Sequence, residues 1–189
     1  GLSTAYHLLR RGVRSTALLE RFELGHARGS SHGKSRITRS SYSSLKYVEL
    51  MQIAHREEWP RLSHEAGRPL IRPNRGCFFG PGVGPYVESL RAADELCDLY
   101  RVLEAKEAVK VFPQFRFPDS TTVIEDLTCG VVAAEETLRF LAEKVVAGAT
   151  LVENCLVTKV SPGTSVVRLH TSAGEFQCDR LVVTAGGWL

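Results

Sequence analysis

The first twenty residues constrain the fold more than any other part of the chain, because they combine a helix, a strand and an acid. Gly1–Arg11 carries apolar residues at helical spacing, and Gly12 follows as a stop signal. Ser15–Leu19 has the length and composition of a strand, and Glu20 ends it. A helix opened by glycine and a strand tipped by an acid about 20 residues later form the second half of a dinucleotide-binding βαβ unit.

A second feature of the same kind lies at the other end of the chain. Leu181–Gly186 is a near-continuous apolar run ending in small residues, which predicts a parallel strand whose C-terminal end meets a ligand. The helix, strand and acid alone leave an alternative open, in which Gly1 is an arbitrary cut and Glu20 a solvated strand end. The fold class we expect is α/β.

Periodicity predicts further elements between these ends, and residues 25–42 are expected to form a loop because they are polar and aperiodic. The expected helices cover residues 45–62, 87–100, 103–111 and 135–147. The expected strands cover residues 75–80, 122–124, 151–157 and 181–186, with a hairpin of 166–171 and 175–179.

Composition excludes several classes of function. A net charge of +3 with dispersed cations argues against nucleic-acid or membrane-surface binding, and we expect neither partner. No apolar run approaches the length of a membrane span, and no signal peptide is visible. The five cysteines include no close pair, so we expect no disulfide framework, no zinc site and a reducing compartment.

The run from Arg28 to Tyr42 is the main candidate site. It has three residues between Gly29 and Gly33 where a phosphate-binding P-loop needs four, so that motif is rejected. Arg36 and Arg39 are three apart, and in a turn or helical bend both reach one side. A guanidinium binds a carboxylate through two parallel hydrogen bonds. A pair of solvated surface arginines is the alternative reading.

The two ends of the chain suggest a piece of a longer protein. The sequence begins at Gly1 without an initiator methionine, and its only methionine is Met51. It stops at Leu189, directly after the predicted strand. We therefore expect a fragment.

Several motifs in order resemble the sarcosine oxidase group of flavin-dependent amino-acid oxidases, and most of all its peroxisomal members, which oxidise sarcosine or L-pipecolate. The motifs are Gly1-Leu-Ser-Thr-Ala-Tyr-His-Leu, Leu18-Leu19-Glu20-Arg21-Phe22, Gly29-Ser-Ser-His-Gly33-Lys-Ser-Arg36-Ile37-Thr38-Arg39, Ser41-Tyr42, Arg75-Gly-Cys-Phe-Phe-Gly80, Val111-Phe-Pro113, Leu181-Val-Val-Thr-Ala-Gly186 and Trp188. The resemblance spans the whole chain.

The resemblance implies a residue-by-residue site around FAD. Arg39 matches the arginine that binds the substrate carboxylate, Tyr42 matches a tyrosine near that pocket, and Arg36 lies toward the cofactor. The matching cofactor-binding residues are Gly1, Glu20, Arg21, Ser31, His32, Arg36, Ile37, Val157, Ala185 and Gly186. His32 is given no role in proton transfer, and no metal is expected.

The resemblance also implies domains and chemistry. It suggests an incomplete FAD-binding Rossmann-like domain, mainly from residues 1–44 and 150–189, interleaved with part of a mixed-sheet substrate domain, mainly from residues 70–130. The family oxidises the C–N bond of a secondary amino acid, and dioxygen reoxidises the flavin to give hydrogen peroxide. The cysteine that attaches FAD and the lysine that activates oxygen are expected beyond Leu189, so the chain alone is expected to be inactive.

Two alternatives remain beside this oxidase reading. One is an FAD-dependent dehydrogenase that passes electrons to another acceptor, and the other is a truncated, non-catalytic nucleotide-binding domain. The expected partners of the oxidase are a small amino acid and dioxygen, its expected state is a monomer, and its expected location by resemblance is the peroxisome.

Overall fold

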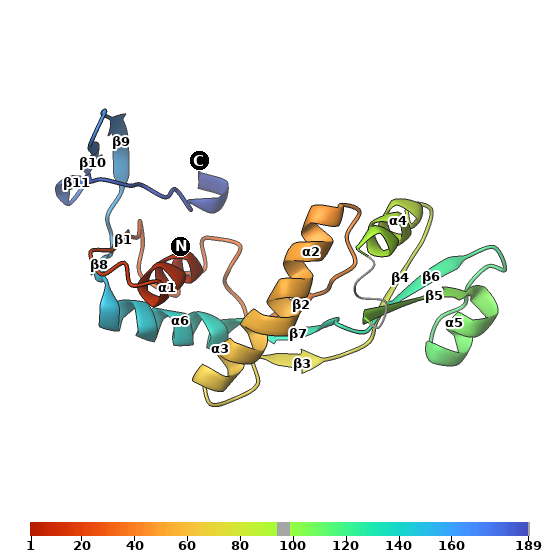
Figure 1. Ribbon diagram of the computed structural model, residues 1–189. Coiled ribbons are helices and arrows are strands. Elements are labelled where there is room, and N and C mark those ends of the chain that lie inside the picture. Colours follow the sequence, from red (N-terminus) through yellow and green to blue (C-terminus); the bar gives the residue numbers. More distant parts are fainter. Residues whose placement is uncertain (94–98, 189) are drawn as a thin grey trace. The chain divides into compact units, whose positions relative to one another are not determined.

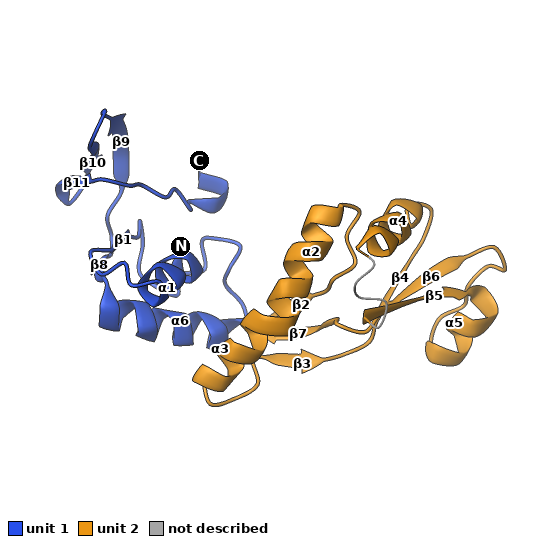
Figure 2. Cartoon of the chain, in the orientation of Figure 1, with its two compact units in different colours: residues 1–34, 134–189 blue, residues 35–133 orange. Residues whose placement is uncertain are grey.

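The computed structural model describes residues 1–93 and 99–188 (Figure 1). The chain divides into two compact units, which are coloured separately in Figure 2. Unit 1 comprises Gly1–Lys34 and Ala134–Leu189, and unit 2 comprises Ser35–Ala133. Among the described residues, no helix combines the length and apolar composition that a bilayer span requires.

Unit 1 contains a small parallel sheet with two helices packed together beside it (Figure 1). Tyr6 of one helix and Phe140 of the other contact each other, with ring centroids 6.3 Å apart. Strands β1 and β8 pair in parallel, as expected for a βαβ arrangement. The elements are α1 (Leu2–Arg10), β1 (Ala17–Leu19), α6 (Ala134–Gly148) and β8 (Thr150–Val152).

The predicted glycine stop of helix α1 is confirmed. Gly12 has a positive φ of 82°, which favours glycine, and its N–H donates to the Leu9 carbonyl at 3.0 Å. The next N–H, of Val13, donates to the Leu8 carbonyl at 3.0 Å. These bonds satisfy carbonyls of the last turn, so the chain leaves α1 and enters β1.

An antiparallel sheet of three strands completes the regular structure of unit 1, in the order β11-β10-β9. The strands are β9 (Val157–Pro162), β10 (Val167–Thr171) and β11 (Gly174–Cys178). The predicted hairpin is confirmed in β10 and β11. The single strand predicted over residues 151–157 is wrong, because Asn154 takes a positive φ of 54° and separates β8 from β9.

The predicted strand at Leu181–Gly186 is also wrong. The segment forms no strand, and Val182 and Val183 are 56% and 53% exposed. Gly186–Trp188 forms a short 3-10 helix, η3. An apolar run becomes a strand only beside a hydrogen-bonding partner, and none of the described strands pairs with this one.

Unit 2 contains two antiparallel sheets, with strand orders β2-β7-β3 and β4-β6-β5. The first sheet consists of β2 (Ser35–Thr38), β7 (Gly130–Ala133) and β3 (Ile71–Pro73). The second consists of β4 (Gly76–Phe79), β6 (Thr122–Asp126) and β5 (Tyr100–Glu104). The prediction of a loop over residues 25–42 is therefore wrong at β2. Its partner lies far along the chain, where Arg36 faces Val132 in β7.

Three helical segments follow one another in unit 2, as the periodicity of residues 45–62 predicts. They are α2 (Leu45–Ile53), the π-helix η1 (Ala54–Glu58) and α3 (Trp59–Glu65). Gly67, with a φ of 66°, follows the last helical turn. The wider turn of a π-helix is uncommon and is often found at functional sites.

The remaining helices of unit 2 are shorter than predicted. Helix α4 covers Gly84–Ala92, and α5 covers Ala105–Val111. The predicted helix over residues 87–100 fails at Tyr100, which begins β5, while residues 94–98 lie outside the described part. Leu103 also belongs to β5, because its partner Val123 in β6 fixes it in the sheet.

Two buried clusters form the core of unit 2. The first joins Val48 of α2, Val87 and Leu90 of α4, and Ile124 of β6. The second joins Leu103, Ala108, Phe112 and Val123 between α5 and its sheet. Strand β6 contributes Ile124 and Val123 to these clusters, so its C-terminal residue, Asp126, follows directly on buried core residues.

Candidate functional site

Arg39 lies just beyond the end of β2, and its guanidinium lies close to two aromatic rings. The guanidinium carbon is 5.0 Å from the centroid of Tyr42 and 5.5 Å from that of Phe78. All three residues are half-buried. Within the described part of the chain, Arg39 has no carboxylate partner. Its N–H donors are therefore available to an anion, which makes this the strongest candidate for a carboxylate site.

The residues between Arg39 and Tyr42 are buried and strongly hydrogen-bonded. The N–H groups of Ser40 and Ser41 both donate to Oδ2 of Asp126, each at 2.8 Å. The hydroxyl of Ser41 donates to the same oxygen at 2.7 Å. Asp126 is only 2% exposed. The backbone between the two candidate side chains is thus fixed to the end of β6.

A contact on the other side of Arg39 involves Thr38, which is 5% exposed. Its Oγ1 lies 3.1 Å from Nε2 of His55 in the π-helix η1. Burial lowers the pKa of His55, and the negative charge of Asp126 opposes that shift. His55 therefore favours its neutral form. His55 thus contacts the residue that precedes Arg39.

The positive charge of Arg39 also affects the pKa of Cys129, which lies just before β7. Burial raises the pKa of the Cys129 thiol, Asp126 raises it further, and the N–H of Gly130 and the charge of Arg39 lower it. The balance leaves Cys129 protonated, which makes it a weak nucleophile. Among the described residues, no group of three metal-ligating side chains occurs.

Arg36 and Ile37 lie on β2, and both are exposed; Ile37 is 78% exposed. Arg36 Nη1 donates to the carbonyl of Ser35 at 2.7 Å. Because Arg36 lies in a strand and Arg39 beyond its end, the turn or helical bend expected to bring both to one side is wrong. Successive strand residues alternate between faces.

Glu20 follows β1 and has one carboxylate oxygen in use. Its Oε1 accepts the N–H of Phe22 at 2.9 Å and lies 3.5 Å from Nε2 of His26. In the described chain, Oε2 has no hydrogen-bond or ion-pair partner, and the side chain is 27% exposed. A ligand hydroxyl would therefore find a fixed acceptor at this oxygen.

Arg21 stacks on aromatic rings from two parts of unit 1. Its guanidinium carbon is 5.2 Å from the centroid of Phe22 and 4.9 Å from that of Trp188. The two rings meet edge to face at 6.0 Å. This stack joins the end of β1 to the C-terminal segment that includes Ala185 and Gly186.

Gly1 is the N-cap of helix α1 and lies near that segment. A Cβ at Gly1 would be 3.4 Å from Oγ1 of Thr184 and 3.6 Å from Leu18. Ala185 accepts the N–H of Trp188 at 3.2 Å, and Gly186 has a positive φ of 62°. Unit 1 thus gathers Gly1 and the segment from 184 to 188 around the end of β1.

The other candidate residues of unit 1 are exposed. Val157 begins β9 and is 37% exposed, and two residues before it the N–H of Cys155 donates to the Glu20 carbonyl at 2.9 Å. Ser31 and His32 lie in a turn, where Nδ1 of His32 contacts the Gly29 carbonyl. The hydrogen bond between Cys155 and Glu20 therefore places Val157 only two residues along the chain from a contact with Glu20.

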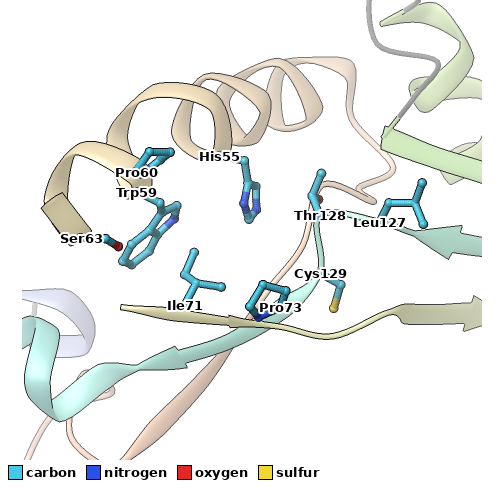
Figure 3. A pocket seen from close by; sticks show the side chains of 9 residues that line it. All are labelled: His55, Trp59, Pro60, Ser63, Ile71, Pro73, Leu127, Thr128 and Cys129. Atoms are coloured by element: carbon cyan, nitrogen blue, oxygen red, sulfur yellow. The ribbon is translucent and has the colours of Figure 1, made fainter. Parts of the chain in front are cut away.

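A pocket of about 250 Å³ lies in unit 2, between the helical segments and the sheet containing β3 and β7 (Figure 3). Its lining residues are His55, Trp59, Pro60, Ser63, Ile71, Pro73, Leu127, Thr128 and Cys129. None of the site residues predicted from sequence lines it. His55 and Thr128 border it, and both also contact the segment that carries Arg39.

Sequence reasoning missed three residues beside the candidates, namely His26, Phe78 and Asp126. His26 had a local signal, since it lies six positions after Glu20 in a short polar segment. Phe78 stands in the motif Arg75-Gly-Cys-Phe-Phe-Gly80 but had no assigned role, and Asp126 had no local signal. Strands β4 and β6 bring both residues to the Arg39 segment from distant parts of the chain.

The sequence of the chain matches a known protein family. The family model described as "FAD dependent oxidoreductase" matches residues 1–189. The mouse protein named peroxisomal sarcosine oxidase is 33% identical over the whole chain and 48% of its own length. Monomeric sarcosine oxidase of Bacillus sp. (strain B-0618) is 28% identical, again over the whole chain and 49% of that protein. The chain therefore spans about half the length of the curated relatives it matches.

Solved structures agree in fold. NikD, described as an unusual amino acid oxidase essential for nikkomycin biosynthesis, matches with a TM-score of 0.78 and 24% identity. That match covers 99% of this chain and 49% of NikD. L-proline dehydrogenase from P. horikoshii matches with a TM-score of 0.77 and 18% identity, over 99% of this chain and 50% of that one. These likenesses support the mixed α/β fold with a partial Rossmann-like domain.

Proposed function

The chain belongs to the FAD-dependent oxidoreductase family, and from that premise we propose that the whole protein oxidises a secondary amino acid. The proposed substrate is sarcosine or L-pipecolate, and the proposed acceptor is dioxygen, so that the products are an imine and hydrogen peroxide. The names of the relatives support the sarcosine oxidase assignment.

The observation that carries this proposal is the state of Arg39. Charged groups removed from water normally have a partner of opposite charge. The buried carboxylate of Glu125 in unit 2 follows that rule, since it pairs with Arg75 at 3.2 Å and also with Arg101. Arg39 is half-buried and has two aromatic rings instead. A carboxylate-bearing substrate would supply the missing charge through two parallel hydrogen bonds.

The residues of unit 1 fit the adenosine end of FAD. Oε2 of Glu20 is an open acceptor suited to ribose hydroxyls, and Oε1 is already fixed by Phe22. Gly1 heads a helix that has no side-chain cap, so backbone N–H groups at that end remain available to a phosphate. We assign cofactor binding to these residues together with Arg21, Ser31, His32, Arg36, Ile37, Val157, Ala185 and Gly186.

FAD, when bound, supplies the acceptor for the two electrons that leave the substrate's C–N bond. The contribution of this chain is orientation. Arg39 would hold the carboxylate, and that single anchor decides which carbon of the amino acid faces the cofactor. Packing against Tyr42 and Phe78 would restrict the orientation of the guanidinium. No proton transfer is assigned to these residues.

We propose a division of labour that follows the two units only in part, because residues 35–44 belong to unit 2. We assign FAD binding mainly to residues 1–44 and 150–189 and substrate contact mainly to residues 70–130. The positions of Glu20 in unit 1 and of Phe78 in unit 2 support this division. The proposed location is the peroxisome, on the printed names of the mouse and human relatives, and the proposed state is a monomer.

One alternative is favoured by a specific observation, namely the fold match to a proline dehydrogenase. A dehydrogenase would share the Arg39 site but would reduce a carrier instead of dioxygen. A truncated, non-catalytic nucleotide-binding domain is the second alternative, and it would use unit 1 alone.

Turnover of the whole protein with sarcosine or L-pipecolate distinguishes the oxidase, the dehydrogenase and the non-catalytic domain. The proposal expects peroxide in air at a rate equal to substrate loss. Turnover that requires an added electron acceptor and gives no peroxide would support the dehydrogenase. FAD binding without turnover of either amino acid would support the non-catalytic domain.

A further inference from the structure

We propose that Asp126 is a positioning residue that sets the place of Arg39 and Tyr42 without pairing with either. The inference rests on the proposed carboxylate-binding role of Arg39. It adds a residue from β6 that neither the motifs nor the comparisons indicate. The contacts on both oxygens of Asp126 support it.

One oxygen of Asp126 holds the backbone between the two candidate side chains. Oδ2 accepts the N–H groups of Ser40 and Ser41 at 2.8 Å and the Ser41 hydroxyl at 2.7 Å. The chain order is Arg39, Ser40, Ser41, Tyr42. Fixing the two central residues therefore fixes where both flanking side chains begin.

The other oxygen holds Asp126 to the turn that follows β6. Oδ1 accepts the N–H of Thr128 at 2.9 Å and its hydroxyl at 2.6 Å. Oγ of Ser40 lies 2.7 Å from Oγ1 of Thr128, which closes the network. Strand β6 belongs to both core clusters, so the carboxylate is attached to a rigid element.

The chemistry of these partners explains why Arg39 keeps its charge available. A buried aspartate close to an arginine ordinarily forms a salt bridge with it. Here the carboxylate accepts five hydrogen bonds, and every donor is neutral. The acid is satisfied without the guanidinium, which is left to a ligand. Asp126 thus supplies position and does not consume the charge.

A second contact fixes the chain on the N-terminal side of Arg39. Oγ1 of Thr38 lies 3.1 Å from Nε2 of His55, and His55 and Thr128 appear together at the pocket of Figure 3. Arg39 is therefore preceded and followed by residues with fixed partners. A recognition side chain has to be held within about 0.5 Å of its productive position, which such contacts achieve.

The test measures carboxylate binding directly, with acetate as the probe and the whole FAD-loaded protein as the sample. Binding is followed by the change in the visible flavin spectrum. Four forms are compared: the natural protein, Asp126→Asn, Arg39→Lys and the double variant. Asp119→Asn, which changes an exposed aspartate of unit 2, is the control. Asparagine has nearly the shape of aspartate, but its amide N–H groups would face either the Ser40 and Ser41 donors or the Thr128 donors, and they cannot accept a hydrogen bond from them.

We expect Asp126→Asn to weaken acetate binding about tenfold, and to have no further effect in the Arg39→Lys background, because both changes remove one coupled interaction. Additive effects, or unchanged binding in Asp126→Asn, would overturn the inference while the Arg39→Lys loss leaves the proposed function standing. Unchanged binding in Arg39→Lys would overturn the carboxylate role, and the inference with it.

A milder variant serves if Asp126→Asn does not fold. Ser41→Ala removes one of the three bonds at Oδ2 and keeps both backbone bonds. We expect it to weaken acetate binding about threefold, again only while Arg39 is present. Ser43→Ala, at an exposed position of the same segment, is the control. Equal behaviour of the two serine variants would overturn the inference.

Discussion

At the scale of single residues, Arg39 and Glu20 share one property. Each side chain is held in place by neighbouring residues and still has hydrogen-bonding atoms available to a ligand. Arg39 packs against two aromatic rings, and its N–H groups have no carboxylate partner among the described residues. Glu20 is fixed through Oε1 and open at Oε2. This combination of held and available donors or acceptors is what preorganised binding requires.

Arg39→Lys should raise KM for sarcosine in the whole protein about tenfold or more, with a much smaller change in kcat. Lysine keeps the charge but loses the two parallel donors and the flat surface that stacks on Tyr42 and Phe78. Steady-state peroxide release measures both constants. Arg91→Lys on α4, an exposed arginine, is the matched control. Equal kinetics in the two variants would remove Arg39 from the site.

Glu20→Gln should weaken FAD binding about tenfold, because a charge-assisted hydrogen bond to the ribose becomes a neutral one. The contact of Oε1 with Phe22 can persist in the variant, so the fold should be retained. Titration with FAD of apoprotein that lacks the expected FAD-attaching cysteine, followed by flavin fluorescence, measures the affinity. Glu23→Gln, an exposed acid of the same segment, should bind FAD like the natural protein. An unchanged affinity for Glu20→Gln would contradict the assignment.

Sequence reasoning at this scale identified side chains but not their neighbours. Arg39, Tyr42 and Glu20 stand in local motifs and could be named from spacing and resemblance. Phe78 and Asp126 reach Arg39 only because β4 and β6 pair in one sheet, which is a long-range event. Local patterns carry no information about such pairings.

At the scale of elements, strands β3 and β7 approach each other closely at Gly130. A Cβ at Gly130 would lie 2.7 Å from Cγ2 of Ile71 and 2.8 Å from the backbone oxygen of Arg72 in β3. The backbone oxygen cannot retreat without loss of the β3–β7 pairing. Only glycine therefore fits at this position.

Gly130→Ala should lower the free energy of unfolding by about 1–3 kcal/mol, the usual cost of forcing an extra group into a packed site. Gly82→Ala is the matched control in unit 2, since a Cβ there has nothing within 4 Å. Urea denaturation followed by circular dichroism measures both changes. Equal stability of the two variants would show that β3 and β7 do not approach as described.

The π-helix η1 should respond to acid through His55. Burial lowers the pKa of His55, so the folded state binds this proton less readily than the unfolded chain does. Stability is fully present above the unfolded pKa of about 6.5, and it falls as the pH drops through that value toward the lowered folded pKa. Below the folded pKa the loss is complete.

His55→Gln removes this titration and keeps a side chain able to hydrogen-bond Thr38. The Tm advantage of the natural protein over the variant should therefore shrink as the pH falls from about 7.5 to about 5. Differential scanning calorimetry of both proteins in matched buffers measures the difference. A Tm difference that is constant across this range would contradict the burial of His55.

Element prediction succeeded where the signal is local. The helices α1, α6 and the run from α2 to α3 follow directly from the spacing of their apolar residues. The strands β2, β3 and β7 are short and were missed, because only their mutual pairing makes them strands. The failure at Leu181–Gly186 has the same cause, since an apolar run without a pairing partner stays irregular.

At the scale of the whole molecule, the chain is two units with different candidate chemistry. Unit 1 holds Glu20, Arg21 and Gly1 around the end of β1, and unit 2 holds Arg39 against the rings of Tyr42 and Phe78. The α/β class and the FAD family were both predictable, and the comparisons confirm them. The activity is a property of the whole protein, so it is tested there.

The most direct test compares peroxide release from sarcosine with that from dimethylamine, which keeps the secondary amine and lacks the carboxylate. The account predicts that sarcosine is oxidised with a kcat/KM at least about a hundredfold higher, because only sarcosine engages the open edge of Arg39. Equal kcat/KM values for the two amines, or no peroxide from sarcosine and L-pipecolate in the whole protein, would contradict it.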